Sequence, residues 1–136
     1  VMALFGVQAD PQTASQRALK AASAIIRILA ELSQTLAEEL HEPLSIGVGI
    51  HTGPAVVGRM GRAVASYLTA VGDTAHVASR LQDLTKEYQR QMVISEHVAQ
   101  LTGLYVSPFP RRELTVRNRA EPIVMRMIKE FQSVVI

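Results

Sequence analysis

Residues 71–81 read VGDTAHVASRL, and this stretch decides how the middle of the chain folds. Asp73 or Thr74 can cap the free amides at a helix start. The apolar face of the predicted helix consists of Val77, Leu81, Leu84 and Tyr88, and a neighbouring polar stripe consists of His76, Arg80, Asp83 and Glu87. Arg80 therefore leaves the helix beside the core, where its planar, permanently charged guanidinium suits a phosphate.

On both sides of this helix the chain alternates between strand and helix patterns. The expected strands are residues 1–7, 44–50, 55–58, 67–71, 91–94, 112–116 and 123–131, and the expected helices are residues 10–39, 73–88 and 95–101. Thr52, Gly53 and Pro54 supply a turn that predicts a hairpin of residues 44–50 with residues 55–58. The order predicts an α+β fold with a mostly antiparallel sheet and helices on one face.

Composition predicts one domain built on one core. The chain has 136 residues, of which 48% are hydrophobic and 19% charged. A net charge of +2, from 14 basic and 12 acidic residues, is too small to indicate nucleic-acid binding. The chain has no cysteine, which excludes disulfides and thiolate metal sites and agrees with the expected cytoplasmic location.

Several short motifs resemble known binding sites, but the elements or residues that such sites require are not expected around them. Gly47 and Gly49 form a GxG, but a hairpin rather than a helix is expected after them, so a dinucleotide site is disfavoured. Residues 58–62, GRMGR, lack the lysine and hydroxyl of a Walker loop. The histidines outside the predicted central helix lie on different elements without ligand spacing, which disfavours zinc.

Residues 18–40 carry five charges, so we expect an amphipathic helix that packs on the sheet, with a coiled-coil seam as the alternative.

Four segments in the same order resemble the class III nucleotidyl cyclases, the adenylate and guanylate cyclases. Residues 71–81 are similar to that family's GDTVNxAARLE segment, and residues 46–61, IGVGIHTGPAVVGRMG, resemble its glycine-rich hairpin. Residues 1–6, VMALFG, resemble the strand after its second metal-binding aspartate. Residues 116–125, VRNRAEPIVM, are similar to its LKGxxEPV segment. Together these matches span nearly the whole chain.

The resemblance implies a fold and a reaction. It implies the ferredoxin-like palm of a class III cyclase without its first strand and helices, so that residues 1–136 form the C-terminal portion of the catalytic domain. The implied reaction converts ATP to 3′,5′-cyclic AMP and pyrophosphate at a site shared by two subunits of a homodimer. It uses Mg²⁺ or Mn²⁺ held by two aspartates, which we expect before Val1. Asp10 and Asp73 do not replace them, because each stands at a predicted helix start. An upstream sensor or membrane domain remains compatible with the sequence.

The resemblance also assigns four site residues. Arg80 falls on the arginine that offsets transition-state charge, and His76 stands where the family usually has a ribose-positioning asparagine. Thr69 falls on the base-reading position, where many bacterial adenylate cyclases carry threonine. Arg117 falls on the triphosphate-binding lysine, and Asn118 replaces the glycine that usually follows.

Each assignment has a simpler alternative. Arg80 can form a surface salt bridge with Asp83 or Glu87. His76 can be a solvated helical histidine, Thr69 an ordinary β-branched strand residue, and Arg117 an exposed charge in a turn.

These residues support three interpretations. The first is the later part of an adenylate cyclase catalytic domain, which would be inactive as an isolated fragment because the metal-binding half of its site is missing. The second is a degenerate, non-catalytic regulatory or dimerisation module, favoured by His76 and Asn118. The third is a purely structural α+β interaction domain.

Overall fold

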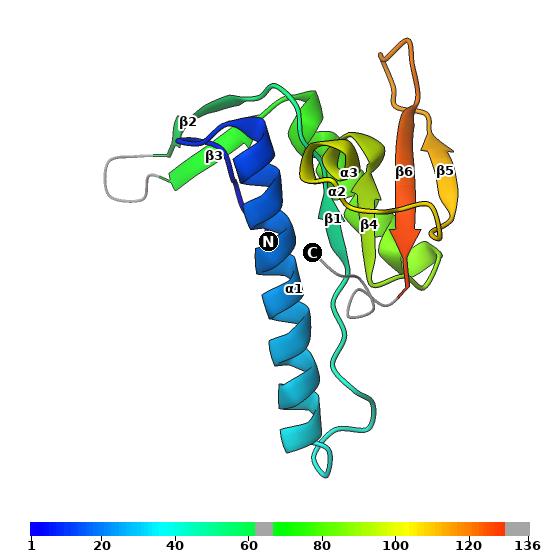
Figure 1. Ribbon diagram of the computed structural model, residues 1–136. Coiled ribbons are helices and arrows are strands. Elements are labelled where there is room, and N and C mark those ends of the chain that lie inside the picture. The colour runs from blue at the N-terminus through cyan, green and yellow to red at the C-terminus, as the bar shows by residue number, and fades with distance from the viewer. Residues whose placement is uncertain (62–66, 130–136) are drawn as a thin grey trace.

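A four-stranded sheet forms the centre of the computed structural model, which describes residues 1–61 and 67–129 apart from the side chains of residues 60 and 67–69 (Figure 1). The strands lie in the order β1-β4-β6-β5, where β1 is Val48–Ile50, β4 is Met92–Ser95, β6 is Ile123–Ile128 and β5 is Arg111–Leu114. β1 runs parallel to β4, and β6 runs antiparallel to both of its neighbours. The expected α+β class is therefore confirmed for the described residues.

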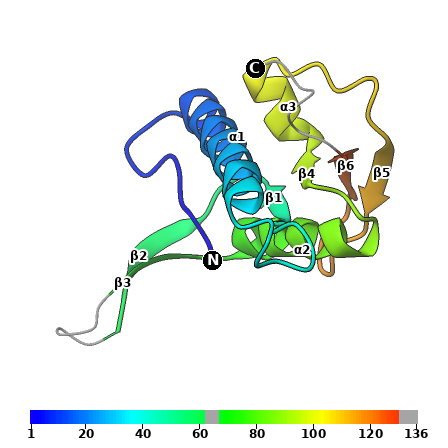
Figure 2. The same ribbon diagram turned by 90° about the horizontal axis from the view of Figure 1, so that it is seen from below.

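Helices cover both faces of this sheet, which differs from the expectation that they share one face. α1 (Pro11–Thr35) and α3 (Glu96–Thr102) pack on one side, and α2 (Asp73–Glu87) packs on the other (Figure 2). The reason lies in β4, where Met92 and Ile94 join the α1 and α3 core while Val93 joins the α2 core. A strand that is buried on both faces needs a layer on each side.

α1 begins as its sequence predicts and ends earlier. Asp10 Oδ1 accepts a hydrogen bond of 2.9 Å from the amide of Thr13, and Pro11 opens the helix. The helix ends at Thr35 rather than near residue 39. Its apolar stripe is buried only as far as Ile26, and Leu32 beyond it is 42% exposed. Among the described residues, no helix combines the length and hydropathy needed to cross a bilayer.

β2 (Val56–Met60) and β3 (Tyr67–Val71) form a separate antiparallel hairpin that projects away from the sheet (Figures 1 and 2). The predicted pairing of residues 44–50 with 55–58 is therefore wrong. β1 takes β4 as its partner instead, with Val48 opposite Met92. The chain after β1 is held at the start of α2, where the Thr74 hydroxyl donates a 2.5 Å hydrogen bond to the Pro54 carbonyl. This contact leads β2 away from β1.

Residues 1–7 form no strand, so that prediction is wrong. Val1, Met2, Phe5 and Val7 are exposed, and no described strand supplies hydrogen bonds to this segment. The later elements agree with their predicted ranges within a few residues. Gly103, at φ 72°, ends α3 as expected. The end of the last predicted strand, residues 130–131, lies outside the described part of the chain.

α2 lies close against β1 because Gly49 has no side chain. A Cβ built on Gly49 would stand 2.4 Å from the Gln82 amide nitrogen and 2.6 Å from the Ala78 carbonyl oxygen. Both atoms belong to the backbone of α2, which cannot move away as a flexible side chain can. Gly49 therefore sets the distance between this helix and the sheet.

We predict that Gly49→Ala lowers the free energy of unfolding by about 2 kcal/mol or more, because α2 must shift off β1. Gly58→Ala is the matched control, since a Cβ on Gly58 meets nothing within 4 Å. Its effect is expected to stay within about 0.5 kcal/mol. Urea unfolding measures both values, and equal stability of the two variants would contradict the close packing of α2.

Candidate active site

Arg80 lies on the outward side of α2, between two residues that anchor the helix. Val77 and Leu81 are fully buried against the sheet, whereas Arg80 is exposed. Within residues 1–61 and 67–129, no carboxylate forms an ion pair with Arg80, so the alternative pairing with Asp83 or Glu87 does not occur there. The guanidinium is thus held on a fixed helix while its donors stay available.

His76 lies one helical turn before Arg80 and is also exposed. A spacing of four residues puts the two side chains on the same stripe of α2. The predicted side-chain cap at this helix start is absent. Gly72 is the N-cap residue, Thr74 binds Pro54, and Asp73 forms an ion pair with Arg119. His76 is therefore exposed near the start of α2, where Asp73 and Thr74 already have partners elsewhere in the chain.

Arg117 lies in the turn between β5 and β6 and is exposed. The turn is shaped by Asn118, which has a left-handed φ of 70°, and by a 3.1 Å hydrogen bond from the Arg119 amide to the Val116 carbonyl. Val116 is buried in the core beneath α2. No ion pair holds Arg117 to the described residues.

An ion pair that the sequence did not predict joins this turn to α2. Nη1 of Arg119 lies 2.5 Å from Oδ2 of Asp73, although the two residues are 46 positions apart. The contact brings the Arg117 turn to the helix end that carries His76. The sequence shows an acidic residue in the first turn of a helix and several arginines in a distant turn. It does not show which of these arginines pairs with Asp73.

His51 lies beside this ion pair at the end of β1. Burial, followed by the charges of Arg119 and His97, lowers the pKa of His51 to about 4, and the carboxylate of Asp73 opposes the shift. Nδ1 of His51 is buried without a hydrogen-bond partner in the described structure. The imidazole is therefore neutral at neutral pH.

Thr69 lies on β3, opposite Gly58 of β2, and its side chain falls outside the described part of the structure. The backbone places it on the projecting hairpin, which β3 connects directly to α2. The assignment of Thr69 to base recognition stays a prediction.

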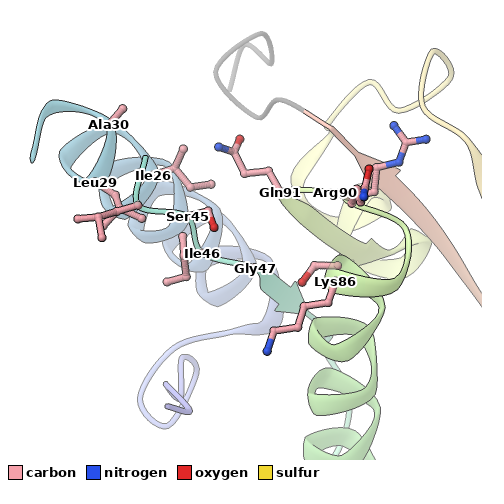
Figure 3. A pocket seen from close by; sticks show the side chains of 12 residues that line it. Ile26, Leu29, Ala30, Ser45, Ile46, Gly47, Lys86, Arg90 and Gln91 are labelled. Atoms are coloured by element: carbon pink, nitrogen blue, oxygen red, sulfur yellow. The ribbon is translucent and has the colours of Figure 1, made fainter. Parts of the chain in front are cut away.

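A cavity of about 480 Å³ opens at the other end of α2 (Figure 3). It lies between α1, the segment before β1 and the C-terminal end of α2, and its apolar wall includes Ile26, Leu29 and Ile46. None of the four predicted site residues lines it. We therefore place the candidate site on the exposed stripe of α2 and not in this cavity.

The described residues do not fit a divalent metal site. They contain no group of three histidine or acidic side chains that could hold an ion. Asp10 caps α1 and Asp73 binds Arg119, so these two aspartates already have partners.

The fold and the sequence match those of nucleotide cyclases. A sequence model of the adenylate and guanylate cyclase catalytic domain matches residues 1–130. The chain therefore belongs to this family, the class III nucleotidyl cyclases.

Sequence relatives include cyclases of distant organisms. The terminal-differentiation-specific adenylate cyclase of Dictyostelium discoideum is 30% identical over 126 residues, which is 90% of this chain and 6% of that protein. An adenylate cyclase of Anabaena cylindrica is 42% identical over 55 residues, 40% of this chain and 11% of that protein. The chain thus spans a small part of these relatives.

Solved cyclase structures share the fold. The guanylyl cyclase Cya2 aligns with a TM-score of 0.73 at 23% identity, over 91% of this chain and 62% of that one. The adenylyl cyclase CyaB from P. aeruginosa aligns with a TM-score of 0.70 at 22% identity, over 97% of this chain and 65% of that one. The expected class III palm is confirmed by these similarities.

The His51 environment predicts a pH dependence of stability. The folded pKa of about 4 lies below the ordinary value of 6.5, so the unfolded chain binds a proton between these pH values that the folded chain does not bind. The free energy of unfolding should therefore fall as the pH drops from 6.5 toward 4. His51→Asn should flatten this slope. Urea unfolding at several pH values measures it, and an equal slope in both proteins would contradict the burial of a neutral His51.

Proposed function

We propose that this chain contributes the transition-state-stabilising half of an adenylate cyclase site formed between two subunits. The observation that carries the proposal is the exposed Arg80, which has no ion pair among the described residues and lies on a helix whose opposite face is fixed in the core. The match to the cyclase family supports a role for Arg80 in the cyclase reaction. A cytoplasmic location, where ATP is available, is part of the proposal.

The reaction creates negative charge that Arg80 is suited to meet. The 3′-oxygen of ATP forms a bond to the α-phosphorus and loses its proton to solvent, while the bond from the α-phosphorus to the bridging oxygen breaks and pyrophosphate leaves. Charge grows on the α-phosphate oxygens and on the leaving group. A guanidinium with parallel N–H donors stabilises such charge without rearranging its own structure.

The other site residues have separate proposed roles. His76 can donate one ring N–H to the ribose, and Arg117 can bind the outer phosphates through its guanidinium. The hydroxyl of Thr69 can both donate to and accept from a base edge. The adenylate cyclases among the relatives support ATP as the substrate. Class III cyclases generally use divalent metals, and we propose that Mg²⁺ or Mn²⁺ binds to residues outside this chain.

The projecting hairpin supports association with a second subunit. Val56 is 75% exposed and Val71, its partner across the hairpin, is 54% exposed. Exposed apolar side chains gathered on one projecting element mark a surface that packs against another protein. Because β3 leads directly into α2, a second subunit bound there would lie near the Arg80 stripe.

For the dimer we predict that Val56→Asp shifts the chain from dimer toward monomer, because a carboxylate would be buried at the contact. Tyr105→Asp is the matched control, since Tyr105 is also 75% exposed but lies outside the hairpin. Sedimentation equilibrium measures the association constant. An unchanged constant for Val56→Asp would remove the hairpin from the interface.

For catalysis we predict that Arg80→Ala in the full-length protein that carries this chain lowers kcat by about 100-fold or more, through the loss of one oriented charge donor. Thermal unfolding should change little, because the side chain is exposed. Formation of cyclic AMP from ATP and Mn²⁺ measures kcat.

Arg27→Ala supplies the control for Arg80, because Arg27 is an exposed arginine on α1. It should leave kcat unchanged, and the 136-residue chain alone should form no cyclic AMP. An unchanged kcat in Arg80→Ala would exclude Arg80 from the mechanism.

A non-catalytic regulatory module is the second candidate function. It is favoured by His76 and Asn118, which depart from the family pattern. Such a module would bind ATP without turnover in the full-length protein. The same cyclic AMP assay, run beside a measurement of ATP binding, separates the two functions.

A further inference from the structure

The Asp73–Arg119 ion pair connects two segments that each carry a proposed nucleotide contact. Asp73 lies in the first turn of α2, ahead of His76 and Arg80. Arg119 lies two residues after Arg117 in the turn between β5 and β6. The ion pair is thus a direct link between the turn that would bind the outer phosphates and the helix that would bind the reacting phosphate.

Arg117 lies between two fixed points of its turn. On one side Val116 is 7% exposed and packs in the same core as Val77 and Leu81 of α2. On the other side Arg119 is held by Asp73 and by its own amide, which donates to the Val116 carbonyl. The two anchors stand only three positions apart, so they limit where the backbone of Arg117 can lie.

The ion pair contributes little to the stability of the fold. The side chains of Arg119 and Asp73 are 37% and 46% exposed, and ion pairs in water at this exposure contribute only a fraction of 1 kcal/mol. Removing one should therefore leave the protein folded. An effect on nucleotide binding could then be separated from an effect on folding.

We propose that Asp73 and Arg119 are a pair of positioning residues, which hold the turn so that Arg117 and Arg80 meet the same triphosphate. This inference rests on the proposed cyclase function. Neither residue of the pair touches the nucleotide. Asp73 acts by fixing Arg119, and Arg119 acts by fixing the backbone of Arg117.

The full-length protein tests this with Asp73→Asn, Arg119→Gln and the double variant. Each single change should raise KM for ATP by about 5- to 10-fold, and the double variant should show the same rise, because either change already releases the turn. Arg119→Lys, which keeps the charge, should restore most of the affinity. Thermal unfolding should stay near that of the unchanged protein in all variants.

A second exposed ion pair supplies the matched control. Arg111 and Glu113 of β5 lie 3.2 Å apart at 48% and 52% exposure. Arg111→Gln and Glu113→Gln should leave KM unchanged. If only the Arg119 variants raise KM while Asp73→Asn does not, Arg119 itself contacts the nucleotide and the positioning role is overturned. Multiplying effects in the double variant, or no effect in any, overturn it as well.

The proposed function and the positioning role fail in different ways. If the unchanged protein forms no cyclic AMP, or if Arg80→Ala leaves kcat unchanged, the proposed function fails and the positioning role fails with it. If Arg80→Ala abolishes turnover and Arg117→Ala raises KM, but the pair variants behave like the Arg111 and Glu113 controls, only the positioning role is overturned.

Discussion

The packing of α2 against the sheet is the constraint on which the rest of the structure depends. Val77 and Leu81 are fully buried, and Gly49 allows the helix backbone to approach β1 closely. A helix fixed on one face has its opposite face fixed as well, because its side chains follow the 3.6-residue period. The direction in which Arg80 leaves the core is thus decided by apolar packing and by the absence of one side chain.

Two segments adjoin the N-terminal end of α2. The β2–β3 hairpin enters α2 through Gly72 and carries exposed valines, which we propose to contact a second subunit. The turn between β5 and β6 reaches the same helix end through the Asp73–Arg119 ion pair. One helix end thus meets both the hairpin that we propose to bind a second subunit and the turn that we propose to bind the phosphates.

The sequence predicted the features that depend on local rules. The structure confirms the cap at Asp10, which follows from capping chemistry. It confirms the apolar face of α2 for Val77, Leu81 and Leu84, which follows from helical spacing. Tyr88 was wrongly included in this face, because it follows the last residue of α2 and is 38% exposed. Strand partners depend instead on distant parts of the chain. Period two marks residues 48–50 as a strand without revealing that β4, over 40 residues later, pairs with it. The Asp73–Arg119 pair was missed for the same reason, because the charges in a sequence do not show which residues form an ion pair. Residues 1–7 have a strand composition but no described neighbour to pair with.

The most direct test of the proposed site is a crystal structure of the full-length dimer with a non-hydrolysable ATP analogue. We expect the guanidinium of Arg80 to lie within about 3 Å of an α-phosphate oxygen, the distance of a charge-assisted hydrogen bond. The nucleotide should lie in a groove completed by the second subunit. A nucleotide bound elsewhere, with Arg80 directed into solvent, would contradict the proposed role of this helix.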